Sequence, residues 1–247
     1  MRRYPPYASV SHSFGPGSVT PAVKAIIWAN VGVYVLTWLV PALTQLLGLI
    51  PQAVFGRLWI WQPVTYMFVH GGLSHILFNM LGVWMFGVEL ERLWGTRFFV
   101  RFYAVAGLGA AATTLVWALL PLGSSAQIYY AVTIGASGAL YGLLLAFAVY
   151  YPDRPILMFL LFPIPAKYFV LIIGAIAFMA SAGSGGGGIA HTAHLGGLVA
   201  AYLYLKGARS LVAEIKYRYL RWKMHRLRKR FDVHAGGRRD DWNRRVH

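Results

Sequence analysis

The residues best suited to chemistry in this sequence are a few polar side chains that interrupt long apolar runs. They are His70, His75, Asn79, Ser137, His191 and His194. Polar and ionisable groups inside a membrane are energetically costly and are commonly functional. A serine becomes a nucleophile when a neighbouring base takes its proton, so Ser137 and a histidine predict acyl-transfer chemistry. The alternative is a serine that bonds only to helix backbone, which is the commoner state of serine in membrane helices.

The composition predicts that membrane helices position these residues. Hydrophobic residues make up 58% of the 247 residues and charged residues only 12%, about half of the roughly 25% usual in globular domains. Uncharged apolar runs of about 18 or more residues are typical of membrane-spanning helices. Divided at turn-forming segments, the runs predict an all-α polytopic protein with six spans, at 24–48, 73–92, 99–120, 133–151, 166–182 and 189–206. Two proline-containing apolar segments, 51–72 and 155–165, are predicted to be interfacial or re-entrant.

The basic residues predict the orientation of the spans. With six spans both termini lie on one side, and that side receives every lysine and arginine except Arg57. Because cytoplasmic loops are rich in Lys and Arg, both termini are predicted to be cytoplasmic. The absence of a long transit region before the first span favours a plasma or inner membrane. This topology brings Ser137, His75 and His194 to one depth, towards the non-cytoplasmic ends of three spans.

His194 is the candidate base for Ser137. No Asp or Glu lies near this depth in any predicted span, so the proton acceptor has to be a histidine. Spans four and six each have a face of small residues, namely Gly138, Gly142, Gly196, Gly197, Ala200 and Ala201. Such faces let two membrane helices approach closely enough for a Ser–His hydrogen bond. Ser137 also begins its helix, where free N–H groups and the helix dipole favour a developing anion.

The other polar residues have two interpretations each. Tyr141 lies one turn from Ser137 on the same helix face and either supports the imidazole or simply packs. His75 and Asn79, spaced i and i+4, are either two donors of an oxyanion hole, together with the Ser137 N–H, or a hydrogen-bonded core pair. His191, one turn before His194, fits a supporting or a rim position.

Other chemistries fit the pattern less well. There is no cysteine, and no carboxylate lies among the spans at this depth. Histidines can bind zinc through neutral nitrogens, but no HExxH motif, no cysteine and no carboxylate accompanies them here, so no metal and no cofactor are expected. A transporter would distribute ionisable groups through the membrane rather than at one depth. The net charge of +16 is local, since 14 of 23 basic residues lie in the last 42 positions. No nucleic-acid partner is expected.

Three motifs together resemble those of rhomboid intramembrane serine proteases. They are His70-Gly-Gly-Leu-Ser-His75-Ile-Leu-Phe-Asn79 in span two, Gly135-Ala136-Ser137-Gly138 in span four, and Ala193-His194-Leu195-Gly196-Gly197 in span six. Their order, spacing and placement agree with the family over about 24–206. The resemblance implies a six-helix rhomboid-like bundle with an irregular first external loop.

The resemblance also implies a reaction. Ser137 is expected to attack a peptide bond near the outer membrane boundary, with His194 as base and then acid, through an acyl-enzyme. His75, Asn79 and the Ser137 amide are implied to stabilise the oxyanion, with Tyr141 in support. The neighbouring glycines are implied to support the site as well, Gly135 in a strand-like loop that enters the nucleophile helix and Gly138 within that helix. Single-span membrane proteins are the expected substrates, and the oligomeric state is open. The rival is a catalytically silent rhomboid-like protein that binds or escorts membrane clients.

Several segments outside the three motifs also match parts of the family. The Trp61-Gln62 pair falls where the family often carries Trp-Arg in its first loop. Residues 91–95 resemble the family's cytoplasmic end of span two and are expected to be structural. The glycine-rich segment 183–188 resembles the family's mobile cap, and its composition independently predicts flexibility.

The sequence predicts three regions. These are a flexible cytoplasmic N-terminus at 1–23, the membrane domain at 24–206 and a basic cytoplasmic tail at 207–247. Within the tail, 211–231 has the pattern of a loosely amphipathic helix. It either lies on anionic lipid at the membrane surface or is a solvated segment that only enforces topology. The chain after Gly236 is predicted to be disordered.

Overall fold

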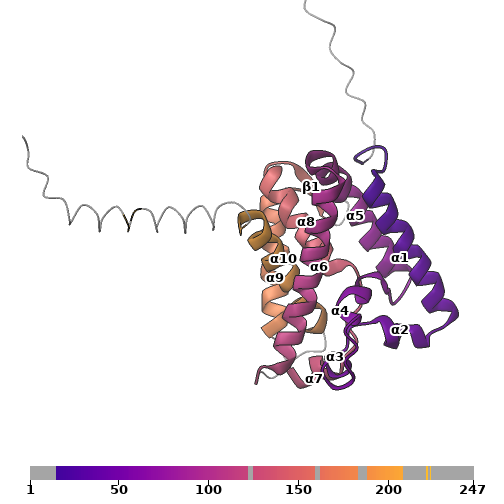
Figure 1. The fold of residues 1–247 in the computed structure, drawn as a ribbon. Helices are drawn as coiled ribbons and strands as arrows, with labels where there is room; N and C mark the ends of the chain where they lie inside the picture. Colours follow the sequence, from indigo (N-terminus) through magenta and orange to yellow (C-terminus); the bar gives the residue numbers. More distant parts are fainter. Residues whose placement is uncertain are drawn as a thin grey trace, which may run out of the picture. The chain divides into compact units, whose positions relative to one another are not determined.

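A computed structural model describes residues 15–121, 125–158, 162–182, 188–207, 221 and 223. Helices dominate the described chain, and a two-stranded sheet accompanies them (Figure 1). In chain order the elements are α1 (Pro21–Leu39), α2 (Ala42–Leu47), α3 (Pro51–Arg57), α4 (Gln62–Thr65), η1 (Tyr66–Phe68), α5 (Leu73–Trp94), α6 (Thr96–Leu119), α7 (Ser125–Tyr130), α8 (Ser137–Tyr150), β1 (Pro155–Met158), β2 (Phe162–Pro165), α9 (Ala166–Ala182) and α10 (Gly188–Lys206).

The expectation of a mainly helical membrane protein is confirmed. Among the described residues, α1, α5 and α6 are long and apolar enough to cross a membrane, and α8 and α9 are shorter apolar helices. Large apolar side chains remain exposed on their outer faces, including Trp38, Phe78 and Met179. Lipid is the environment in which such a surface is stable.

The first predicted span is wrong in its extent. A helix was predicted over 24–48, but α1 ends at Leu39 and the short α2 follows. Val40 has φ −128° and ψ 83°, because the ring of Pro41 disfavours helical geometry in the residue before it. The chain therefore turns away from the axis of α1 before it reaches the first loop.

The apolar segment 51–72 forms short helical pieces, and buried Gln62 joins it to the preceding residues 45–50. Its Oε1 accepts a hydrogen bond from Ile50 N at 2.9 Å, and its Nε2 donates to Gln45 O at 3.1 Å. The indole N–H of Trp61 donates to Leu46 O at 2.9 Å. Backbone groups that no helix pairs are thus satisfied by side chains, as irregular backbone at membrane depth requires.

The fourth predicted span, 133–151, begins later than expected. Thr133 pairs instead with Leu49 through two backbone hydrogen bonds, of 2.9 and 2.8 Å. Gly135 has φ +111°, a backbone conformation that a helix cannot contain and that glycine adopts without strain. Its N–H donates to Tyr66 O at 3.0 Å. Helix α8 therefore starts at Ser137, directly after an extended segment that lies against the first loop.

Segment 155–165 is a β-hairpin, which an all-α class did not foresee. Strands β1 and β2 pair antiparallel from Pro155 with Pro165 to Met158 with Phe162. Three prolines in this short stretch remove backbone donors, so a helix cannot form, whereas an isolated hairpin tolerates them at its edges. The hairpin links α8 to α9.

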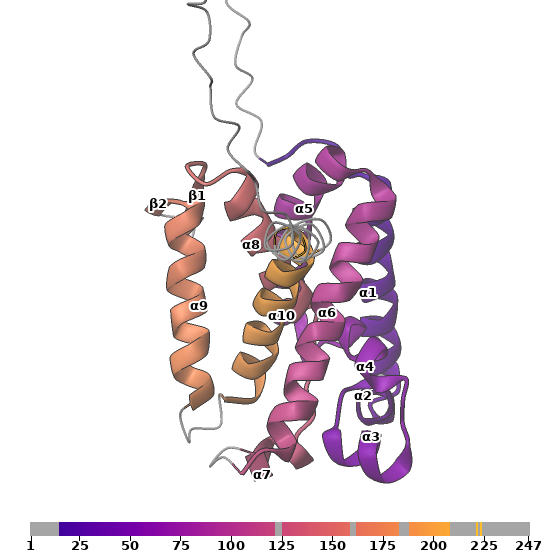
Figure 2. The ribbon, with the colours of Figure 1, turned by 60° about the vertical axis from the view of Figure 1, so that its left-hand side comes forward.

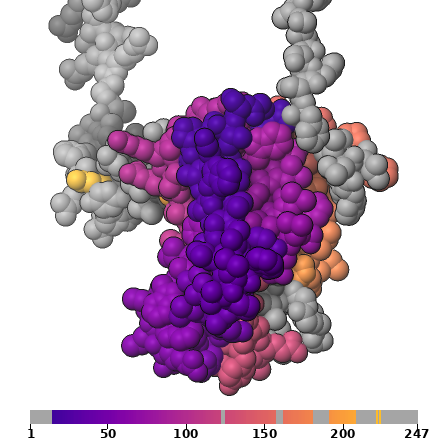
Figure 3. Space-filling model, turned by 90° about the vertical axis from the view of Figure 1, so that its right-hand side faces the viewer, coloured from indigo at the N-terminus to yellow at the C-terminus, as the bar shows by residue number. Residues whose placement is uncertain are grey.

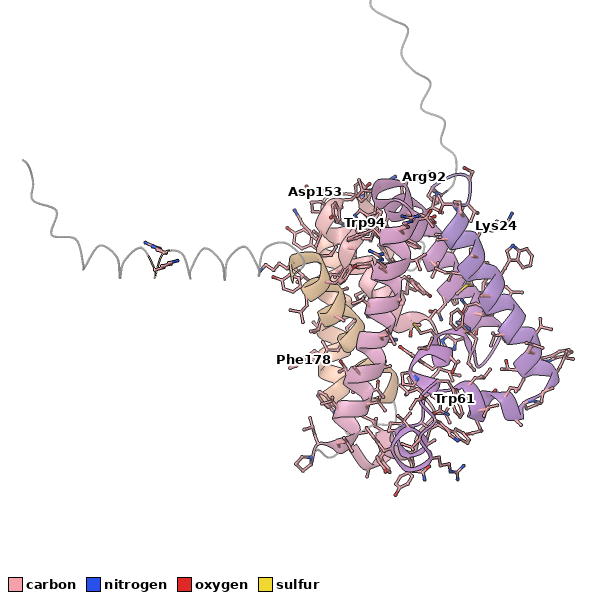
Figure 4. All side chains as sticks on the ribbon, viewed as in Figure 1. Lys24, Trp61, Arg92, Trp94, Asp153 and Phe178 are labelled. Carbon is pink, nitrogen blue, oxygen red and sulfur yellow. The ribbon has the colours of Figure 1, made fainter. Side chains whose placement is uncertain are left out.

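One end of the helical region gathers the hairpin, the α5–α6 turn and the C-terminal end of α10, while α2, α3 and α7 lie at the other end (Figure 2). Figure 4 shows Lys24, Arg92 and Asp153 at the first end and Trp61 towards the second. The charged turns predicted to share one side of the membrane thus share one end of the structure. Figure 3 shows an outer face in which α1 (indigo) lies beside the purple part of the chain that follows it.

The carboxylate of Glu91 joins two elements at the first end. It accepts hydrogen bonds from Ala22 N and Val23 N, both at 3.0 Å, and from the hydroxyls of Thr20 and Thr96. The first N–H groups of α1 have no partner within their own helix, and Glu91 supplies one. This contact gives a physical basis to the structural role expected at 91–95.

Residues 183–187 of the cap predicted at 183–188, and nearly all of the predicted amphipathic helix at 211–231, lie outside the described residues, whereas Gly188 begins α10. The same holds for residues 1–14 and for the chain after Gly236.

Candidate active site

Ser137 and His194 meet although 57 residues separate them. The Oγ atom of Ser137 lies 2.8 Å from Nε2 of His194, a normal hydrogen-bond distance. Ser137 is the first residue of α8, and His194 lies in the first half of α10. Both residues are half-buried, so the pair is neither sealed in the interior nor fully exposed.

Helix α8, which begins at Ser137, is short. The rings of Tyr150 and Trp94 are 5.5 Å apart, which places the end of α8 beside the end of α5. From there α8 rises only about 20 Å over its 14 residues, at about 1.5 Å per residue. A bilayer core is roughly 30 Å thick, so α8 is about 10 Å shorter than this thickness.

Small residues bring α8 and α10 into backbone contact. A Cβ atom on Gly197 would overlap the carbonyl oxygen of Gly138 and lie 2.7 Å from its carbonyl carbon. A Cβ on Gly142 would lie 3.1 Å from Cβ of Ala201. The helices are therefore as close as their backbones permit, one helical turn from the Ser137–His194 contact.

The imidazole of His194 is held on three sides. Tyr141 stacks flat against it, with ring centroids 4.1 Å apart and an interplanar angle of 8°. His191 meets it edge-on, with centroids 5.8 Å apart at 83°. Ser137 contacts its Nε2 atom. The stacked contact of Tyr141 agrees with both interpretations of this residue, support of the imidazole and plain packing.

His75 faces the start of α8 from the neighbouring helix α5. A Cβ atom on Gly135 would lie 2.7 Å from Nε2 of His75, so only glycine leaves room for the ring. The N–H of Gly71 points at Nδ1 of His75 at 3.4 Å, which favours a lone pair on Nδ1 and the proton on Nε2. In this tautomer His75 directs an N–H donor towards the backbone that enters Ser137.

Asn79 lies one turn after His75 and is buried. Its Nδ2 donates to the carbonyl of His75 at 2.9 Å, and its Oδ1 has no hydrogen-bond partner among the described residues. One of its two amide hydrogens is thus committed to its own helix, and the other remains free to donate.

His70 is buried next to His75. Its ring meets that of His75 edge-on at 4.9 Å, and it lines a cavity of about 310 Å³ between α1, α2 and Gly71-Gly72. It contacts neither Ser137 nor His194 through any hydrogen bond among the described residues. Within the same residues, no cluster of three or more His, Asp or Glu could hold a metal ion.

One known protein family matches the part of the chain that contains the described site. A Rhomboid domain match covers residues 57–209, which include every residue of the site. This chain belongs to the rhomboid family.

Three curated rhomboid relatives are similar to the chain at about 30% identity. Rhomboid protein 1, mitochondrial, of Saccharomyces cerevisiae is 29% identical over 74% of this chain and 51% of its own length. Rhomboid protease AarA of Providencia stuartii is 28% identical over 36% of this chain and 34% of its own length. Rhomboid protease GluP of Bacillus subtilis is 30% identical over 58% of this chain and 25% of its own length. The chain thus spans about half or less of the length of these relatives.

Helix α6 is the part of this rhomboid site that the sequence reasoning missed. Its small residues pack against both α8 and α10: a Cβ on Gly138 would lie 2.5 Å from Cβ of Ala110, and a Cβ on Gly109 would overlap Cβ of Ala200. The signal was present in the sequence, because 106–112 reads Ala-Gly-Leu-Gly-Ala-Ala-Ala. Such a stripe marks a helix that others approach closely.

Proposed function

We propose that this rhomboid is an intramembrane serine endopeptidase that cleaves single-span membrane proteins near the outer membrane boundary. The observation that carries the proposal is the 2.8 Å contact between Ser137 Oγ and His194 Nε2. Two relatives of the chain are named rhomboid proteases, which supports the same reaction here.

The proposal includes six membrane spans with both termini in the cytoplasm of a plasma or inner membrane. In this arrangement α8, α9 and α10 cross beside the three longer helices. The gathering of Lys24, Arg92 and the hairpin region at one end supports the orientation, since basic residues favour the cytoplasmic side.

In the proposed reaction the Ser137 hydroxyl attacks the carbonyl carbon of the scissile bond while its proton passes to His194 Nε2. The oxyanion accepts hydrogen bonds from the Ser137 N–H, from His75 Nε2–H and from the free amide hydrogen of Asn79. His194 then gives its proton to the leaving amine. A water molecule loses a proton to His194 and attacks the acyl carbon, and His194 returns that proton to the Ser137 oxygen as the acyl group leaves.

The substrate has to present an exposed backbone to this site. A peptide bond within a helix hides its carbonyl in intrahelical hydrogen bonds, so a substrate helix must unwind before Ser137 can reach it. Single-span proteins with helix-weakening residues near the cut meet this requirement.

The rival is a catalytically silent rhomboid-like protein that binds or escorts clients, and the contact between Ser137 and His194 argues against it. A client-binding protein has no need for a serine and an imidazole at hydrogen-bond distance. The intact pair therefore favours the protease.

The proposal is tested by incubating the purified full chain in detergent with a single-span substrate and measuring cleaved product. Wild type is expected to cleave and to be labelled by a fluorophosphonate probe, whereas Ser137→Ala does neither. Ser18→Ala, whose hydroxyl contacts Arg92 far from the site in sequence, is the control and is expected to behave as wild type. Equal product from wild type and Ser137→Ala would end the protease proposal.

A further inference from the structure

The imidazole of His194 has a second nitrogen that the dyad leaves unexplained. To accept the Ser137 proton at Nε2, the neutral ring must carry its own proton at Nδ1. That Nδ1 atom is buried and has no hydrogen-bond partner among the described residues. Serine hydrolases with a triad supply a carboxylate at this position to fix the tautomer, and within the part of the chain that the structure describes no carboxylate is hydrogen-bonded to His194.

His191 contacts the imidazole of His194 from the same helix. It lies one turn before His194 on α10, and the two rings meet edge-to-face at 5.8 Å and 83°. Its own Nδ1 is also buried and without a partner among the described residues. Two buried imidazole nitrogens, one a donor and the other able to accept, thus lack a partner among the described residues, and the rings that carry them are in contact.

No direct bond joins the two rings among the contacts of the described residues, and a single water molecule can satisfy both. Water donates one hydrogen bond and accepts another, and a bridged hydrogen bond is nearly as favourable as a direct one. Such a water molecule would satisfy two buried groups that are costly to leave unpaired.

We propose that His191 is a positioning residue: through one bridging water molecule its Nδ1 accepts the hydrogen bond of His194 Nδ1–H. This interaction holds His194 in the tautomer that can act as a base. It strengthens when His194 becomes an imidazolium during the attack of Ser137, because a charged donor forms the stronger hydrogen bond. No proton leaves His194 by this route. The inference rests on the proposed protease function.

The competing explanation is that His191 only packs, as an aromatic edge against an aromatic face. Two substitutions separate the explanations. His191→Phe keeps a ring of similar size and the edge-to-face contact but removes Nδ1. His191→Asn loses the ring but places an amide oxygen close to the position of Nδ1.

The experiment measures kcat and KM for a single-span substrate, together with the rate of Ser137 labelling by a fluorophosphonate. His191→Phe is expected to lower kcat and the labelling rate by about 10- to 100-fold, the effect of losing one hydrogen bond to a charged group. Its KM is expected to stay within about twofold of wild type, because His191 is proposed to act on His194 and not on bound substrate. His191→Asn is expected to recover most of the lost rate.

Three results would overturn the inference. They are a His191→Phe enzyme as fast as wild type, a His191→Asn enzyme as slow as His191→Phe with the same thermal unfolding midpoint, and a loss that falls on KM alone. Failure of the proposed function looks different, because wild type itself would then show no Ser137-dependent labelling.

Discussion

The backbone contact between α8 and α10 permits a quantitative prediction for Gly197→Ala. The added Cβ would overlap the Gly138 carbonyl oxygen and lie 2.7 Å from the carbonyl carbon, whereas ordinary contacts begin at 3.4 Å. Both partners are helix backbone, which cannot rotate away as a side chain can. The helices must therefore separate by at least about 0.7 Å, since packed interiors have no spare room.

That separation acts directly on the Ser137–His194 contact. A 2.8 Å hydrogen bond lengthened by this amount reaches about 3.5 Å, where it contributes little. A misplacement of about 1 Å in a catalytic pair commonly lowers the rate about 100-fold. We expect Gly197→Ala to lose about that factor in cleavage of a single-span substrate and in fluorophosphonate labelling. Overpacking is expected to lower the free energy of unfolding by about 1–3 kcal/mol.

Matched glycine substitutions provide the controls. A Cβ on Gly174 of α9 would lie 3.5 Å from Leu198 Cδ1, and one on Gly32 of α1 would meet nothing within 4 Å. Gly174→Ala and Gly32→Ala are expected to keep activity near wild type. A Gly197→Ala protein that cleaves as fast as these controls would refute the argument that close helix packing sets the Ser–His distance.

Two further predictions concern the oxyanion side and the cytoplasmic end. Gly135→Ala is expected to lower kcat at least about tenfold while the protein still folds. The new Cβ would lie 2.7 Å from His75 Nε2, at a backbone φ of +111°. An unchanged kcat in a steady-state assay would contradict this prediction. Glu91→Gln is expected to lower the free energy of unfolding by about 1–3 kcal/mol, since an amide hydrogen would face an N–H donor that the carboxylate accepted. Thermal unfolding in detergent measures it, with the exposed Asp153→Asn as a control expected to leave the midpoint unchanged, and equal midpoints for both variants would argue against the capping role.

The candidate pair was accessible to sequence reasoning because membrane helices have few polar side chains and a strong local signal. Uncharged runs of sufficient length indicate helices, and small residues such as Gly138 and Gly197 indicate which faces approach. Once two helices and their facing sides are known, the residues one turn away can be paired. This logic needs no long-range backbone geometry.

The features that escaped prediction depend on contacts between distant parts of the chain. Thr133 leaves the helical pattern because Leu49, far away in sequence, offers it a backbone partner. The role of α6 depends on two neighbours that approach it from different sides, so its small residues gain meaning only in the assembled structure. The hairpin at 155–165 could have been expected from its prolines, which argue against a helix.

The way in which Gln62 anchors the loop between α1 and α5 has a consequence for the conditions under which this protein keeps its shape. An amide side chain carries no charge, so dissolved ions have nothing to screen and acid has nothing to neutralise. The hydrogen bonds of Gln62 therefore do not depend on salt concentration or pH, the two variables that most weaken an ion pair.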